Sequence, residues 1–147
     1  MKLTAAVIQT SSVLLDTPAT VERALGLMKE AAAQGAQVLV FPEAFLGGYP
    51  KGADFHIYLG GRTLQGRTEF KLYFDAAVCV DGPEIAQLAK AAKEYRLYVC
   101  VGIIERDGGT LYCTAWRCSS HTTNSYSPSA WRSAQPKQSL PRQAEFR

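Results

Sequence analysis

The sequence predicts an α/β fold with a parallel sheet for residues 1–115 and no regular structure after them. The first observation is a strand, a helix and a second strand within roughly forty residues, a unit whose two strands run parallel. The second is a set of continuous apolar runs, which is typical of strands covered on both faces. The third is an abrupt change of composition at Trp116.

The first strand–helix–strand unit is the most regular part of the chain. "LTAAVIQ" (3–9) is a short apolar run that favours a strand, and "QVLVF" (37–41) is a second one. Between them, Thr17 and Pro18 provide an N-cap and a proline at the first helical position. Gly35 is placed to end this helix. The apolar residues at helical spacing are Val21, Leu25, Met28 and Ala32.

The middle of the chain predicts a second helical region. "RTEFKLYFD" (67–75) favours a short helix, and "AAVCV" (76–80) favours a further strand. Pro83 then opens a helix with one apolar stripe. The stripe consists of Ile85, Leu88, Ala89 and Ala92.

A hairpin ends the regular part. "LYVCVGIIE" (97–105) predicts a buried strand, and "TLYCTA" (110–115) is its expected antiparallel partner. Asp107, Gly108 and Gly109 supply the turn between them.

Residues 116–147 differ in character from everything before them. This tail contains seven serines, whereas Ser11 and Ser12 are the only two that precede it. Leu140 is its single leucine, isoleucine or valine. Such a segment buries too little apolar surface to offset the entropy of ordering it. We therefore expect one domain part at 1–115 and a disordered or out-of-frame tail at 116–147.

The net charge of +3 comes from the tail. Residues 1–115 hold 11 basic and 12 acidic residues, while residues 116–147 hold 5 basic and 1 acidic. The charge balance therefore gives no reason to expect a nucleic-acid site on the folded part.

The remaining composition indicates a cytoplasmic protein without a membrane segment. No apolar run approaches the roughly 20 residues that span a bilayer. The first residues, "MKLTAAVIQTSS", are too short and too polar for a signal peptide. The cysteines lie mostly in apolar runs without metal-ligand spacing, so buried reduced thiols are favoured. They are Cys79, Cys100, Cys113 and Cys118.

Four stretches together resemble the nitrilase branch of the carbon–nitrogen hydrolase superfamily. They occur in the family's order from Lys2 to about Ala115: "FPEAFLGGYPKG", "GRTEF", "VDGPEI" and "VGIIERDGGTLYCTA". The resemblance implies an α-β-β-α sandwich, of which this chain would hold an incomplete part. It also implies a catalytic triad of cysteine, glutamate and lysine.

By this resemblance Glu43 is the catalytic glutamate and acts as general base. A thiol attacks a nitrile carbon as the thiolate, so it needs a base. A carboxylate at the end of a buried strand is expected to be desolvated, which raises its pKa toward the range useful for proton transfer. Without the flanking motif, Glu43 would be read as an ordinary strand-end acid facing water. Tyr49, in the following loop, either lines the substrate pocket or packs as a structural aromatic.

The other two members of the triad have no counterpart in the sequence. Lys137 is the only lysine of the tail, and "QPKQS" does not match the family's basic stretch. None of the four cysteines has the sequence context of the nucleophile. Cys113 matches a non-catalytic position of the family's hairpin. We therefore assign no catalytic lysine or cysteine.

The resemblance implies a nitrilase-type hydrolase in the intact parent protein, which converts a nitrile to a carboxylic acid and ammonia through a cysteine thioimidate. Its partner would be a small-molecule nitrile, without nucleic acid or membrane, and the intact family member is expected to form a homo-oligomer. Thiolate, base and lysine suffice, so no metal or organic cofactor is expected.

The alternative is that this chain is a non-catalytic truncated fragment, as a frameshift would produce. It would then act, if at all, as an interaction partner of full-length homologues. Co-purification with an intact homologue would distinguish this reading.

Overall fold

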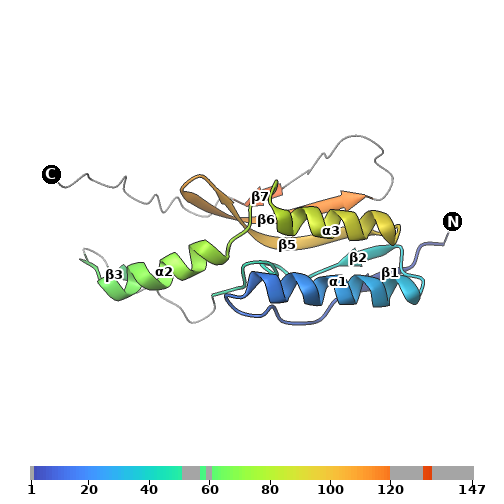
Figure 1. Cartoon of the computed structure of the whole chain (residues 1–147), viewed down its shortest axis with the longest axis horizontal. Coiled ribbons are helices and arrows are strands. Elements are labelled where there is room, and N and C mark those ends of the chain that lie inside the picture. The colour runs from blue at the N-terminus through green and yellow to red at the C-terminus, as the bar shows by residue number, and fades with distance from the viewer. Residues whose placement is uncertain (1, 51–56, 59–60, 120–130, 134–147) are drawn as a thin grey trace.

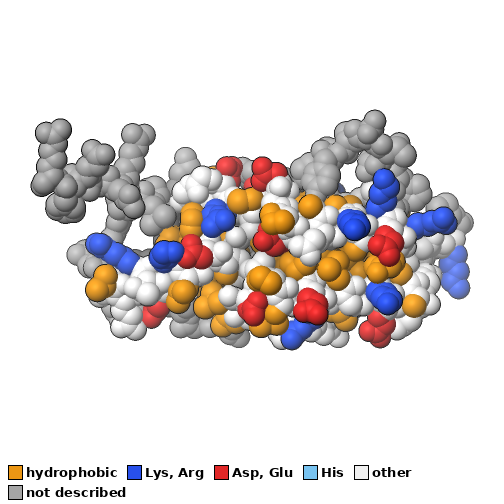
Figure 2. Space-filling model, in the orientation of Figure 1, with side chains coloured by type: hydrophobic (Ala, Val, Ile, Leu, Met, Phe, Trp, Pro, Cys, Tyr) orange, Lys and Arg blue, Asp and Glu red, His pale blue; other side chains and the backbone are white. Residues whose placement is uncertain are grey.

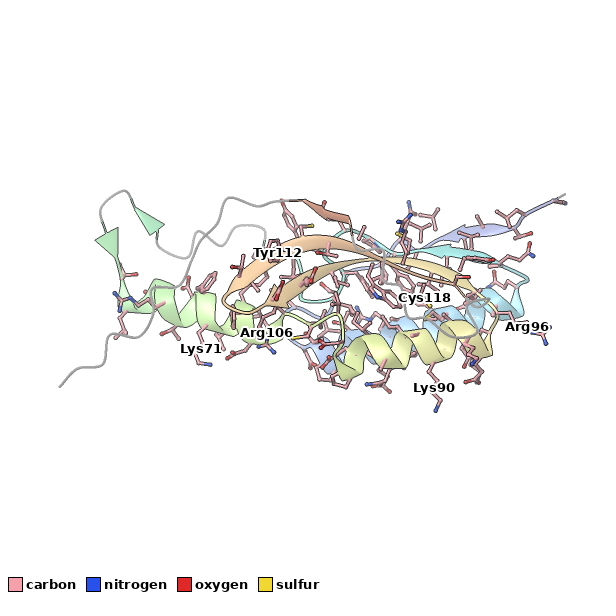
Figure 3. All side chains as sticks on the ribbon, turned by 90° about the horizontal axis from the view of Figure 1, so that it is seen from above. Lys71, Lys90, Arg96, Arg106, Tyr112 and Cys118 are labelled. Carbon is pink, nitrogen blue, oxygen red and sulfur yellow. The ribbon has the colours of Figure 1, made fainter. Side chains whose placement is uncertain are left out.

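The computed structural model describes residues 2–50, 57–58, 61–119 and 131–133. A five-stranded sheet in the order β1-β2-β5-β6-β7 forms its centre. Two helices, α1 and α3, lie side by side on one face of this sheet (Figure 1 and Figure 3). The predicted α/β class is confirmed.

The parallel part of the sheet consists of three strands. They are β1 (Ala5–Val7), β2 (Val38–Val40) and β5 (Tyr98–Asp107), with β2 paired in parallel to both neighbours. The helices α1 (Thr17–Ala33) and α3 (Pro83–Glu94) precede β2 and β5 along the chain. The parallel pairing that the first strand–helix–strand unit predicted is therefore confirmed.

The start of α1 differs from the prediction by one residue. Asp16, not Thr17, is the N-cap, and its side chain accepts a hydrogen bond from the Ala19 amide at 3.0 Å. The Thr17 hydroxyl instead donates to the backbone carbonyl of Ala76, which ties the start of α1 to the end of α2. Gly35 follows the helix with φ +82°, as its expected role at the C-terminus requires.

The second helical region is longer than predicted, and the strand expected after it does not form. Helix α2 covers Leu64–Ala76, with Thr63 as its N-cap. Of the stretch 76–80, Val78 alone forms a bridge, to Glu105 of β5. The strand is lost because Ala76 still belongs to α2 and the chain turns again at Cys79, whose carbonyl accepts from the Gly82 amide.

The hairpin extends past the expected boundary at Ala115. Strand β6 covers Thr110–Ser119 and pairs with β5 over its whole length. Trp116 is 1% exposed, so the first residue assigned to the tail belongs to the core. The expectation was wrong for residues 116–119 because register with β5 continues to Tyr98, which lies opposite Ser119. Composition alone does not report such pairing.

Three short strands complete the described elements. β7 (Trp131–Ser133) pairs antiparallel with β6, at a place where no strand was expected. β3 (Ile57–Tyr58) and β4 (Gly61–Arg62) form a separate two-stranded ribbon.

The two faces of the sheet are covered unequally. The main core lies between the sheet and the two helices and includes Met28, Leu39, Leu88 and Trp116. On the opposite face, Val7, Val40 and Tyr98 are 72%, 37% and 42% exposed. Adjacent strands thus present apolar side chains on an uncovered surface. We call this surface, formed by Ala5, Val7, Val38, Val40, Tyr98 and Cys100, the open face.

The helix side carries both signs of charge. Lysine and arginine side chains alternate there with aspartate and glutamate among apolar atoms (Figure 2). Among the helices of the described residues, none has the length and hydrophobicity needed to cross a bilayer.

The burial of Trp116 gives a test of the extended hairpin. We expect Trp116→Ala to lower the free energy of unfolding by about 3–5 kcal/mol, because it removes a large buried side chain. Leu64→Ala is the control, since Leu64 is 81% exposed and its truncation should change stability by less than about 0.5 kcal/mol. Urea unfolding followed by circular dichroism measures both. Equal stabilities of the two variants would contradict the placement of Trp116 in the core.

Candidate active site

Glu43 lies just beyond the carboxyl end of β2, in a turn bound to the neighbouring strand β5. The Phe41 amide donates to the Cys100 carbonyl at 2.8 Å, and the Gly102 amide donates to the Pro42 carbonyl at 3.1 Å. Leu46 continues the contact, because its amide donates to Gly102 and its carbonyl accepts from the Ile104 amide. Backbone hydrogen bonds on both sides of Glu43 therefore fix its position.

Gly102 permits this turn to approach β5. A Cβ atom at Gly102 would lie 2.5 Å from the Glu43 Cα, 2.6 Å from the Ala44 nitrogen and 2.6 Å from the Pro42 carbonyl oxygen. All three are backbone atoms, and a side chain cannot be accommodated without moving the turn. The absence of a side chain at position 102 thus sets where the carboxylate stands.

The turn itself holds an unusual backbone conformation. Ala44 is 1% exposed and has φ +49°, in the left-handed region that residues with a Cβ seldom occupy. The rings of Phe41 and Phe45, which precede and follow it in the sequence, pack against each other with centroids 5.2 Å apart. Such a conformation persists where the surrounding contacts determine it, and it occurs frequently at functional sites.

The Glu43 side chain is exposed, contrary to the expectation of a desolvated carboxylate. The reason is its side of the sheet. Its carboxylate meets Cys113, which lies on the face of the sheet opposite the main core. The helices α1 and α3 lie on the other face (Figure 3). The turn after β2 fixes the position of Glu43, and among the described residues its side chain stays open to solvent.

Cys113 is the partner that the structure gives to Glu43. Its Sγ donates to Glu43 Oε1 at 3.3 Å, across 70 residues of sequence. Burial, the hydrogen bond to Glu43 and the charge of Glu43 together raise the pKa of the Cys113 thiol to about 11. At pH 7 the thiolate fraction is then on the order of 10⁻⁴. This thiol is a hydrogen-bond donor rather than an activated nucleophile.

Two tyrosines lie nearby: Tyr73 close to Cys113, and Tyr49 close to Tyr73. Tyr73 of α2 is 9% exposed and packs with Ala44 and Ile104. Burial, and then the proximity of Cys113 and Tyr49, raises the pKa of Tyr73 to about 12. Tyr49, the predicted substrate-binding residue, is 62% exposed and therefore does not serve as a core aromatic among the described residues. Its contact with substrate stays a prediction.

A second carboxylate, Glu105, lies on the other side of the hairpin. It is fully buried, and its Oε2 accepts a hydrogen bond from the Thr114 hydroxyl at 2.7 Å. Alternation along β6 directs Thr114 and Trp116 to one face and Cys113 to the other. Glu105 is therefore a structural acid, separate from Glu43. Within the described residues, no group of three histidine, cysteine or acidic side chains is placed to hold a metal ion.

Sequence reasoning identified Glu43 and Tyr49 but missed Gly102, Tyr73 and the role of Cys113. A glycine inside an apolar strand signals a close backbone approach, so the stretch "VGIIE" held a usable sign of Gly102. No comparable sign exists for the tyrosine and the cysteine. Lys137, which does not match the family's basic stretch, lies outside the described residues.

Comparison with known protein families identifies the family of this chain. The family model of carbon–nitrogen hydrolases matches residues 4–123. The chain belongs to the carbon–nitrogen hydrolase family. An aliphatic nitrilase of Sinorhizobium fredii is 58% identical over 114 residues, which cover 78% of this chain and 37% of that protein. A bifunctional nitrilase/nitrile hydratase of Lupinus angustifolius is 52% identical over 110 residues, 75% of this chain and 32% of that protein.

This carbon–nitrogen hydrolase chain thus spans about a third of the length of the curated relatives that it matches. Solved structures agree on the fold. A CN-hydrolase superfamily protein of Xanthomonas campestris superposes with a TM-score of 0.59 at 17% identity, covering 80% of this chain and 37% of that one. An amidase of Nesterenkonia sp. gives a TM-score of 0.55 at 19% identity, covering 81% and 39%. The predicted resemblance to the family and its nitrilase branch is confirmed.

The close approach at Gly102 predicts a large effect of a small substitution. We expect Gly102→Ala to lower the free energy of unfolding by about 1–3 kcal/mol, since the new methyl group overlaps backbone atoms of the Glu43 turn. Gly26→Ala is the matched control. Nothing lies within 4 Å of its added Cβ, and an alanine inside α1 should stabilise by about 0.5–1 kcal/mol. Urea unfolding compares them; a neutral Gly102→Ala would contradict the described turn.

Proposed function

We propose that the fold to which this chain contributes is a nitrilase-type hydrolase, in which Glu43 is the general base. The observation that carries the proposal is the 58% identity to an aliphatic nitrilase over 114 residues. The match to the family model, over residues 4–123, includes the whole Glu43 turn and the β5–β6 hairpin. The hydrogen bonds that fix the turn on β5 support it further, because a base must be held where the proton is transferred.

The reaction assigns Glu43 a definite task. A cysteine thiol adds to the nitrile carbon, and its proton passes through the Glu43 carboxylate to the nitrile nitrogen, which gives a thioimidate. Water then adds to that carbon, ammonia leaves, and a thioester remains. A second water hydrolyses the thioester to the carboxylic acid and restores the thiol. Glu43 can exchange protons in each step because its carboxylate is accessible.

We propose that the nucleophile and the lysine of this site are not among these 147 residues. Cys113 is next to the base, but the pKa of its thiol is raised to about 11, the opposite of what nucleophile activation requires. Cys118 lies on the helix side, and burial raises its pKa as well. On this basis the chain alone is inactive. The described cysteines are free, which suits the cytoplasmic location that we propose.

The open face is where we propose that a second sheet packs, as in an α-β-β-α sandwich. Val7 and Val40 stand in register on adjacent parallel strands, and both are exposed. Glu43 and Cys113 lie on this same side, so a covering layer would also enclose the carboxylate. Enclosure would supply the desolvation that the described residues do not.

A chimaera tests the proposal. Residues 1–115 of this chain would replace the equivalent residues of the Sinorhizobium fredii aliphatic nitrilase, and ammonia release would be measured from benzonitrile, phenylacetonitrile and a small aliphatic nitrile. We expect turnover by the chimaera and a loss of about 10²–10⁴ in kcat on Glu43→Gln. Glu22→Gln, at an exposed position of α1, is the control and should leave kcat unchanged.

The 147-residue chain alone should release no ammonia above background. Turnover by this chain that disappears in Cys113→Ala would refute the assignment of Cys113 as a donor. A chimaera that folds like the parent nitrilase, as judged by circular dichroism, yet hydrolyses no nitrile would count against the proposed function.

A further inference from the structure

The contact between Cys113 and Glu43 joins two elements that the sequence keeps far apart. Cys113 stands on β6 directly opposite Ile104 of β5, while Glu43 stands in the turn that lies on Gly102 of the same β5 strand. Strand β5 therefore places the thiol and the carboxylate on one side of the sheet. Their hydrogen bond is 3.3 Å long between Sγ and Oε1.

We propose that Cys113 is a positioning residue, whose thiol donates to Glu43 Oε1 and holds the carboxylate in one orientation while leaving Oε2 available for proton transfer. The inference rests on the proposed function of Glu43 as general base. An exposed glutamate side chain with three rotatable bonds would otherwise sample several rotamers. A donor fixed on a strand removes part of that freedom, which is how a supporting group preorganises a base.

The chemistry of the surroundings suits a permanent donor. A carboxylate can only accept hydrogen bonds, so its partner must keep its proton. Among the described residues, two titratable groups adjoin Cys113. One is Glu43 from the turn after β2, whose hydrogen bond and charge raise the pKa of the Cys113 thiol. The other is Tyr73 from α2, whose own pKa is raised in part by the proximity of Cys113. With a pKa of about 11, the Cys113 thiol stays protonated throughout the range in which a nitrilase-type site would work.

Cys113 and Cys118 lie on the same strand but differ in what raises the pKa of the thiol. Cys118 lies five residues further along β6, on the helix side, where burial raises the pKa of its thiol. The pKa of the Cys113 thiol is raised by burial and also by the hydrogen bond to Glu43 and the charge of Glu43. The two thiols therefore provide a test and an internal reference within one strand.

The first arm of the test measures the contact in the full 147-residue chain. Iodoacetamide alkylation is followed from pH 7 to 12, with peptide mapping by mass spectrometry to report each cysteine separately. We expect half-maximal reactivity of Cys113 at pH about 11. In Glu43→Gln the carboxylate charge is gone, so alkylation of Cys113 at pH 8.5 should become roughly tenfold faster, which corresponds to about one pKa unit. Cys118 should be unchanged.

Glu22→Gln is the control for this arm, since it removes an exposed carboxylate from α1 without touching the pair. If Glu43→Gln accelerates alkylation of Cys113 and Cys118 equally, the variant has loosened the hairpin, and the comparison of Cys113→Ala with Cys113→Ser in the second arm then decides. If Glu43→Gln does not change the pH dependence of Cys113 alkylation, the hydrogen bond is absent and the inference fails.

The second arm measures orientation by NMR of the full chain. The two Glu43 Hγ protons should have distinct chemical shifts when the side chain is held, and they should converge when it rotates freely. We expect distinct shifts in the wild type and in Cys113→Ser, which keeps a donor, and convergence in Cys113→Ala. Unchanged Hγ shifts in Cys113→Ala would overturn the positioning role.

These readouts involve no turnover, so they separate the inference from the proposed function. A held carboxylate with an inactive chimaera would leave the contact standing and count against nitrile hydrolysis. An active chimaera with a freely rotating Glu43 would support nitrile hydrolysis and count against the positioning role of Cys113.

Discussion

The close packing of the Glu43 turn against β5 is the constraint on which the rest of the site depends. Gly102 offers no side chain, so the backbone from Pro42 to Ala44 lies directly on the strand. The turn is then secured by backbone hydrogen bonds to Cys100, Gly102 and Ile104. A glutamate held in this way has a fixed Cα position even though its carboxylate is open to solvent, so its position does not depend on burial of its side chain.

The two faces of the sheet differ: one packs the main core, and the other carries the Glu43–Cys113 pair. α1 and α3 bury one face, where Leu39, Val101 and Trp116 contribute to the main core. The other face carries Glu43 and Cys113 together with exposed apolar side chains on β1, β2 and β5. Because successive residues of a strand point to opposite faces, one hairpin can serve both purposes. The buried acid Glu105 and the exposed acid Glu43 therefore belong to different surroundings.

The local electrostatics of the site favour neutral forms of its partners. Burial, neighbouring acidic groups and a carboxylate acceptor raise the pKa values of Cys113 and Tyr73 to about 11 and 12. A nucleophilic cysteine needs the opposite environment, with a cation or a helix N-terminus nearby. In the proposed function these residues form the base side of a hydrolytic site, with the Cys113 thiol as hydrogen-bond donor to Glu43.

The sequence by itself determined the α/β class, the parallel βαβ unit, both core-facing helices and the position of Glu43 after β2, because these follow from local periodicity and turn chemistry. Only the tertiary structure decided that Glu43 meets Cys113 and that Trp116 is buried. Continuous apolar runs such as 97–105 carry no alternation, so they do not reveal which face each side chain takes. Register between strands, which depends on residues far apart in the chain, supplies that information.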